Sequence, residues 1–278
     1  MLAGLPGLEH RIEVGGIGTS IHEAGDGPPL VLLHGGIECG GAMWAPVVAS
    51  LAESFRLIIP DVPGLGASDP VDRLDAGTFA AWLADFLRVA GARKPVLVAH
   101  SLLGSLAAAY ATHNGHDLRR LIIYGAPGVG PYRIPFRLKY VAIRYSIRPT
   151  HANAERFDRF ALLNLDATRK RDPEWFTAFE TYARSRAAVP HVKRAMWQLI
   201  RSGTKRIPDD RLRRISIPVD LLWGQHDRMV PLAVAEGARE RLGWPLHVIP
   251  DAAHAPHIEQ PDAFVQTLCA ILQKNDTP

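Results

Sequence analysis

Strand-like apolar runs alternate with helix-like stretches along most of the chain, and few folds accept this order. Runs typical of strands buried on both faces occur at residues 30–34, 56–60, 95–100, 118–125, 218–224 and 245–250. Two further strand-like runs, at 10–14 and 19–24, open the chain. Helix-like stretches separate the runs, at residues 42–52, 78–90, 102–111, 232–242 and 258–272. The alternation predicts an α/β fold with a mostly parallel, doubly wound sheet covered by helices on both faces.

One interval breaks this alternation. Residues 131–206 contain no convincing strand, several amphipathic helical stretches, and 17 Lys and Arg against 6 Asp and Glu, although the whole chain has a net charge of only +4. We therefore predict a core domain formed by residues 1–130 and 207–278 and a basic, helical cap formed by residues 131–206. Ligands of such sheets bind beyond the carboxyl ends of the strands, so an insertion at that edge is expected to act as a lid.

The composition predicts an ordinary globular protein. With 278 residues, of which 47% are hydrophobic, the chain can bury one large core. No apolar run approaches the roughly 18 residues that a membrane span requires, and the first residues do not resemble a signal peptide. Cys39 and Cys269 lie far apart and belong to no CxxC pair. We expect a cytoplasmic protein with neither a disulfide framework nor a zinc site.

Ser101 follows the strand-like run at 95–100 and precedes a stretch rich in small residues. A strand, a sharp turn and a helix in this order form the setting in which a nucleophilic serine projects from the edge of a sheet. The flanking residues must be small because the strand and helix approach closely; Ala99 and Gly104 are small, whereas Leu103 is not. Leu103 either points away from the strand, with Gly104 giving the close approach, or it distorts the turn. Taken alone, the segment is equally compatible with a serine that only caps the helix.

Two further residues make a nucleophilic role for Ser101 the better interpretation. A serine hydroxyl needs a base to remove its proton and a third group to orient that base. His254 lies in a loop between the last strand-like run and the last helix-like stretch, and Asp227 lies in the loop after the run at 218–224. All three residues are thus expected at one edge of the sheet, in the chain order Ser, Asp, His that this architecture uses.

Five ordered motifs make the chain resemble the α/β-hydrolase family from about residue 9 to about residue 273. They are HGG at 34–36, DVPGLGAS at 61–68, AHSLLG at 99–104, GQHDRMVP at 224–231 and AAHAPHIEQP at 252–261. The resemblance implies that Ser101 is the nucleophile, His254 the general base and Asp227 the orienting acid. It also implies that the N–H groups of Gly36 and Leu102 stabilise the oxyanion.

The chain departs from the family's pattern at three positions, Ala99, Leu103 and Ala253, where glycine is usual. The departures concern the detailed geometry of the turn rather than the assignment of the three residues. The serine itself excludes the aspartate nucleophile of relatives that open epoxides or displace halide.

These features predict a lidded serine hydrolase that cleaves a carboxylic ester or related acyl compound through an acyl-enzyme, with no metal or organic cofactor. The main alternative is hydrolysis of a carbon–carbon bond in a vinylogous diketo acid, for which the HGG segment, the helical lid and the basic charge are suitable. A third possibility, raised by Leu103, is a binding protein of the same fold with slow turnover. Nucleic-acid binding is disfavoured because the basic residues lack interleaved recognition motifs. The physiological substrate, the acyl-chain length and the oligomeric state stay open.

Several residues near these motifs have simpler interpretations. His257 forms a His-x-x-His pair with His254, but there is no third ligand to suggest a metal site. His100 and His226 are expected to serve local hydrogen bonds or to contact solvent. Cys39 is expected either to line the pocket or, more simply, to pack as a small hydrophobe.

A predicted basic helix opens the insertion. Four arginines share one side and four apolar residues form the adjacent side: Arg133, Arg137, Arg144 and Arg148, then Ile134, Leu138, Val141 and Tyr145. The favoured interpretation is that the apolar side roofs the pocket while the arginines are solvated. Peripheral contact with an anionic membrane surface, without stable insertion, is the second. Inward-facing arginines that attract a substrate carboxylate are the third.

Overall fold

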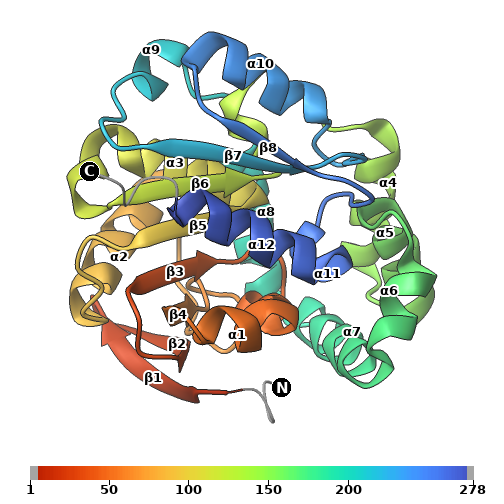
Figure 1. The fold of residues 1–278 in the computed structure, drawn as a ribbon. Helices are drawn as coiled ribbons and strands as arrows, with labels where there is room; N and C mark the ends of the chain where they lie inside the picture. Colours follow the sequence, from red (N-terminus) through yellow and green to blue (C-terminus); the bar gives the residue numbers. More distant parts are fainter. Residues whose placement is uncertain (1–5, 274–278) are drawn as a thin grey trace.

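The computed structural model describes residues 6–273 and is built on one eight-stranded sheet (Figure 1). The strands are β1 (Leu8–Val14), β2 (Ile17–Ala24), β3 (Pro29–Leu33), β4 (Arg56–Pro60), β5 (Val96–His100), β6 (Arg120–Tyr124), β7 (Val219–Gly224) and β8 (Leu246–Ile249). Their order across the sheet is β1-β2-β4-β3-β5-β6-β7-β8. Pairs β1–β2 and β2–β4 are antiparallel, and the other five pairs are parallel. The predicted mostly parallel sheet is confirmed.

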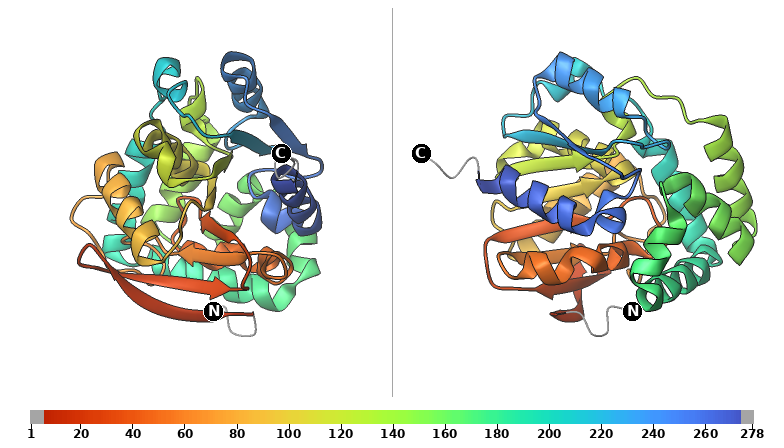
Figure 2. Two further views of the ribbon diagram at one scale, coloured as in Figure 1. Left: turned by 60° about the vertical axis from the view of Figure 1, so that its left-hand side comes forward. Right: turned by 45° about the vertical axis from the view of Figure 1, so that its right-hand side comes forward.

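Helices cover both faces of this sheet (Figure 2). One hydrophobic cluster joins the sheet to α2 (Ala76–Val89), α3 (Ser101–Asn114) and α10 (Leu232–Leu242). The other joins the opposite face to α1 (Ala45–Ala52) and α12 (Pro261–Gln273). Short elements complete the core: α9 (Asp209–Leu212), α11 (Pro256–Glu259) and the 3₁₀ turns η1 (Gly40–Trp44), η2 (Gly115–Asp117) and η3 (Pro127–Val129).

Strand β3 shows why the central runs are continuously apolar. Successive side chains of a strand point to opposite faces, so Val31 and Leu33 belong to one cluster and Leu30 and Leu32 to the other. All four side chains are fully buried. A strand covered on both faces has no solvated side, and polar residues are excluded from every position.

Five of the helices between β6 and β7 lie within residues 131–206, the predicted insertion. They are α4 (Phe136–Ile147), α5 (His151–Ala161), α6 (Leu165–Arg171), α7 (Pro173–Ala187) and α8 (Pro190–Gly203), and this interval, described throughout, contains no strand. Figure 2 (right) shows these green helices standing together along one edge of the sheet.

Two predicted helices differ from the structure because proline interrupts them. The stretch at 42–52 divides into η1 and α1, with Pro46 in the first turn of α1. The stretch at 258–272 divides into α11 and α12, and Pro261 is the first residue of α12. Proline lacks the N–H that continues a helix and clashes with the preceding turn, whereas it fits a helix start.

Candidate active site

Ser101 occupies the turn between β5 and α3. Its φ of 53° lies in the left-handed region, which costs a residue with a side chain about 1–3 kcal/mol. This strained turn directs the hydroxyl into a cavity rather than along the strand. The strand, turn and helix predicted around this serine are all present.

Leu103 does not distort the turn at Ser101. Leu103 is fully buried in the cluster between α3 and the sheet, so it points away from the cavity. The close approach falls one residue later, because a Cβ added to Gly104 would lie 2.9 Å from the carbonyl oxygen of Ala99. A large side chain is therefore accommodated at 103, and the turn keeps its shape.

A continuous chain of hydrogen-bonding groups links Ser101, His254 and Asp227. The Nε2 of His254 lies 3.0 Å from the Oγ of Ser101, and its Nδ1 lies 2.8 Å from Oδ2 of Asp227. The other carboxylate oxygen of Asp227 accepts hydrogen bonds from the N–H groups of Met229 and Val230, at 2.8 and 2.9 Å. With both oxygens engaged, the carboxylate is fixed and can hold the imidazole in one orientation.

The backbone of His254 is held from two sides. His100 Nε2 donates a hydrogen bond to the carbonyl oxygen of His254 at 2.9 Å, and the N–H of His254 donates to the carbonyl oxygen of Ala161 in the insertion at 3.0 Å. Burial lowers the pKa of His100 well below its ordinary value, which keeps this histidine neutral. Glu259 holds the preceding residue, because its Oε2 accepts the N–H of Ala253 at 2.7 Å.

The two residues predicted to donate to the oxyanion, Gly36 and Leu102, are neighbours in the structure. A Cβ added to Gly36 would be 2.6 Å from Cδ1 of Leu102, and both residues line the cavity beside Ser101. Leu102 is in the first turn of α3, where N–H groups have no partner within the helix and the helix dipole favours negative charge. Within residues 6–273 neither N–H donates to an acceptor.

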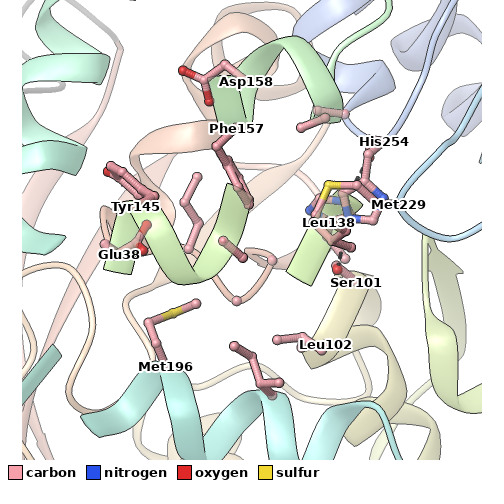
Figure 3. A pocket seen from close by; sticks show the side chains of 18 of the residues that line it. Glu38, Ser101, Leu102, Leu138, Tyr145, Phe157, Asp158, Met196, Met229 and His254 are labelled. Atoms are coloured by element: carbon pink, nitrogen blue, oxygen red, sulfur yellow. Dashed lines mark hydrogen bonds between the residues drawn. The ribbon is translucent and has the colours of Figure 1, made fainter. Parts of the chain in front are cut away.

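The cavity has a volume of about 380 Å³ and is shared by the core and the insertion. Figure 3 shows Ser101, His254 and Met229 at one end, with Tyr145, Glu38 and Asp158 gathered away from them. The apolar lining comes from both parts of the chain, and includes Ile37, Met43, Leu138, Ile143, Phe157, Leu162, Phe176, Phe179, Met196, Trp197 and Ile200. A cavity of this size and polarity suits a small, mostly apolar ligand.

Two carboxyl groups interrupt this apolar lining. Removal from water raises the pKa of Glu38 to about 7 and that of Asp158 to about 8; the negative charges of Glu180 and Glu38 add to the effect at Asp158. Lys139 and Lys193 also line the cavity, but no arginine of the described residues does. The structure therefore gives no support to inward-facing arginines that bind a substrate carboxylate.

Three neighbouring residues that the sequence singled out lie apart from the reaction centre or pack in the interior. His257 is buried, its Nδ1 lies 3.1 Å from the hydroxyl of Tyr124, and burial lowers its pKa to about 3. Cys39 is a buried free thiol in the cluster around α1 and does not line the cavity, and His226 is exposed. The described part of the chain holds no group of three metal-binding side chains and no helix able to cross a membrane.

Sequence reasoning missed Glu259 as a positioning residue. Besides Ala253, this carboxylate accepts the N–H of Leu163 at 2.5 Å, so it connects the histidine loop to the insertion. Its position in the segment AAHAPHIEQP, five residues after His254, was the available signal. A glutamate in a short helix is ordinarily solvated, and only the fold brings Leu163 to it.

Comparison with known proteins identifies the family. The alpha/beta hydrolase family matches residues 30–267. The chain is an α/β hydrolase. It is 27% identical to 2-hydroxy-6-oxo-2,4-heptadienoate hydrolase of Pseudomonas putida, covering 97% of this chain and 98% of that one.

The chain is also similar to an esterase and, in structure, to another dienoate hydrolase. A pimeloyl-[acyl-carrier protein] methyl ester esterase of Vibrio atlanticus is 26% identical over 91% of this hydrolase and 97% of that protein. Among solved structures, 2-hydroxy-6-oxo-6-phenylhexa-2,4-dienoate hydrolase of a Rhodococcus strain has a TM-score of 0.82 at 21% identity, covering 97% of this chain and 99% of that one. Family membership establishes a hydrolytic enzyme of this fold, and its relatives include dienoate hydrolases and a methyl ester esterase.

Proposed function

We propose that this hydrolase cleaves a carboxylic ester, or a related acyl compound with a mostly apolar body, through an acyl-enzyme on Ser101. The observation that carries the proposal is the chain of contacts from Ser101 through His254 to Asp227, at 3.0 and 2.8 Å. A serine hydroxyl within reach of an imidazole that a buried carboxylate orients is the arrangement that acyl transfer requires.

The first half of the reaction forms the acyl-enzyme. His254 Nε2 takes the proton of the Ser101 hydroxyl as Oγ attacks the ester carbonyl, and Asp227 stabilises the imidazolium that results. The negative charge on the former carbonyl oxygen is held by the N–H groups of Gly36 and Leu102, each worth about 2.7–4 kcal/mol in a well-formed site. The carbon–oxygen bond then breaks, and the leaving alcohol takes the proton from His254.

The second half regenerates the enzyme. Water gives a proton to His254 Nε2 and attacks the acyl-enzyme, and the same two N–H groups hold the oxyanion. Ser101 Oγ leaves with the proton from His254, and the free acid departs. The insertion supplies most of the apolar surface against which an acyl or alcohol group would lie.

Carbon–carbon hydrolysis is the second candidate, because the Pseudomonas relative bears the name of a dienoate hydrolase and covers 97% of this chain. A dienoate carries a carboxylate. Two carboxyl groups, Glu38 and Asp158, and two lysines, Lys139 and Lys193, line the cavity, and no arginine of the described chain does, so a substrate carboxylate would have no guanidinium to hold it in two parallel hydrogen bonds. The rest of the lining is mostly apolar, which favours an ester with an apolar body.

A substrate panel tests the proposal. Phenyl esters of graded acyl length, with and without a terminal carboxylate, are compared with a dienoate ketone; we expect the neutral esters to give the highest kcat/KM. Ser101→Ala should abolish turnover and labelling by an active-site phosphonate. Labelling that persists in this variant would exclude the serine mechanism, and faster cleavage of the dienoate would establish the second candidate. Release of one equivalent of product per enzyme, followed by almost no further turnover, would indicate a slow-turnover binding protein.

A further inference from the structure

Helix α4 presents apolar side chains on two opposite sides. On one side Leu138 and Tyr145 are buried, and together with Ala142 they line the cavity. This inner face agrees with the roof predicted from the sequence. On the opposite side of the helix, four large apolar residues are exposed to solvent.

The outer residues form one stripe. Phe136, Tyr140, Ile143 and Ile147 are 82%, 50%, 44% and 67% exposed. Their spacing of four, three and four residues places them on one side of a helix with 3.6 residues per turn, opposite Leu138 and Tyr145. Figure 2 (right) shows α4 at the outer edge of the molecule, on the far side of the insertion from the sheet. Exposed apolar side chains in a continuous row typically mark a binding surface.

Basic residues flank the stripe, and acidic residues are absent from the segment. Residues 131–150 carry five Lys and Arg and no Asp or Glu. All five are exposed: Arg133, Arg137, Lys139, Arg144 and Arg148. Arg144 lies over the ring of Tyr140, with 5.5 Å to the centroid. Among the described residues none forms a hydrogen bond or ion pair with the side chain of Arg137, Lys139 or Arg148, although the backbone carbonyl of Arg148 accepts a hydrogen bond from Asn153.

The stripe also borders the opening of the cavity. Ile143, on the stripe, and Trp197 of α8 are both exposed and both line the cavity. A surface that covered the stripe would therefore lie against the route by which an apolar molecule reaches Ser101.

We propose that this α4 surface, formed by Phe136, Tyr140, Ile143 and Ile147 with the five flanking basic residues, binds peripherally to an anionic phospholipid bilayer. Apolar side chains of an interfacial helix enter the boundary between headgroups and acyl chains, and basic residues beside them attract anionic lipid. A second copy of the chain is a poorer occupant, because pairing the same surface would bring ten positive charges together without an acidic counterpart on the segment. The binding surface is distinct from the catalytic residues.

Flotation with vesicles tests the proposal without any enzymatic readout. Purified hydrolase is mixed with vesicles of pure phosphatidylcholine or of equal parts phosphatidylcholine and phosphatidylglycerol. Binding is expected only to the second kind and should fall with added salt. Each basic residue near an anionic surface contributes about fivefold to the partition coefficient, so Arg137→Gln with Arg148→Gln should weaken binding about 30-fold.

A second pair of substitutions tests the apolar stripe. Phe136→Ser with Ile147→Ser should abolish detectable binding, because both side chains would otherwise leave water. Matched controls carry equivalent changes elsewhere on the surface: Leu8→Ser with Val248→Ser for apolar residues, and Arg93→Gln with Arg239→Gln for charge. The control variants should bind as the unaltered protein does, and circular dichroism melting checks that each variant folds.

Three results would overturn the proposal. In the first, the unaltered protein fails to bind the anionic vesicles. In the second, both α4 double variants bind as well as their controls. In the third, the unaltered protein self-associates in sedimentation and only the α4 variants lose this self-association. The last would assign the stripe to an interface between copies. Because Ser101→Ala should bind vesicles normally, failure here and failure of the proposed catalytic function give different results.

Discussion

Gly203 ends helix α8 directly against the first turn of α3. A Cβ added at this position would lie 2.8 Å from both the Cβ and the carbonyl oxygen of Leu102, and 2.9 Å from its Cα. Carbon atoms in ordinary contact are about 3.5–4.0 Å apart, so Gly203→Ala must separate the two backbones by roughly 0.6–1.2 Å. Leu102 follows Ser101 and carries one of the two proposed oxyanion donors. The substitution therefore acts on the reaction centre without touching the catalytic side chains.

The fall in kcat depends on whether α8 or the turn that carries Leu102 moves to make room for the added methyl group. Helix α8 packs on α3 and buries Val192, Ala195 and Leu199 in the core cluster, so it is not free to swing away as a unit. We expect part of the displacement to fall on the turn that carries Leu102. A displacement of about 1 Å at a catalytic group can cost about 100-fold, and complete loss of an oxyanion donor costs about 10²–10³ in kcat. A fall in kcat of about 10- to 100-fold is the expected outcome, with KM changed much less.

The assay is steady-state hydrolysis of the best ester of the panel, supported by the rate of phosphonate labelling at Ser101. Gly77→Ala is the matched control, since Gly77 is also helical and an added Cβ there would meet only Oδ1 of Asp75, at the ordinary contact distance of 3.4 Å. That control should keep full activity and gain up to about 1 kcal/mol of stability, because alanine favours the helix. If Gly203→Ala matched the control within twofold in kcat, the contact between α8 and the serine turn would have no catalytic role.

Two further predictions concern the carboxyl groups. Asp227→Asn should lower kcat about 10³–10⁴-fold, because an amide cannot stabilise the imidazolium and favours the wrong tautomer of His254; ester hydrolysis near the unaltered rate would contradict the assigned role. Glu38→Gln combined with Asp158→Asn should flatten the dependence of stability on pH. The raised pKa values of about 7 and 8 mean that the unfolded chain loses these protons first, so the two groups lower the free energy of unfolding as pH rises from about 4 to 8. Melting temperatures at pH 5 and pH 8 measure this, and an unchanged difference between the two pH values in the variant would show that neither group has a raised pKa.

The central strands and the edge that carries the site could be predicted because a strand buried on both faces is a continuous run of apolar residues in the sequence. Strands such as β5 are continuously apolar, and the chain order of Ser101, Asp227 and His254 needs only a parallel sheet to bring them to one edge. The location of the three residues depends only on the order of strands and helices, which the apolar patterns indicate well. The breaks before α1 and α12 depend on single prolines, and the predicted helices at 42–52 and 258–272 wrongly continued across them.

Features that depend on contacts between distant segments could not be predicted. Glu38 and Asp158 lie 120 residues apart in the sequence, and each is unremarkable alone. For the segment that forms α4, the sequence predicted one apolar side that covers the pocket, but apolar residues also occupy the opposite side of this helix. Periodicity shows that a helix has apolar sides; only the tertiary packing determines which of them is covered.

The contacts of the insertion indicate where a substrate enters. At the end of α5, three consecutive residues are tied to the catalytic loops: the carbonyl oxygen of Ala161 accepts the N–H of His254, that of Leu162 accepts a hydrogen bond from Arg228 at 2.5 Å, and the N–H of Leu163 donates to Glu259. Opening the insertion at this end would break bonds that position His254, the proposed general base. In contrast, residues 136–147 of α4 make no hydrogen bond to the part of the core that the structure describes. Entry beside α4 would leave His254 undisturbed, and it is on this side that Ile143 and Trp197 border the cavity and the apolar stripe faces outward.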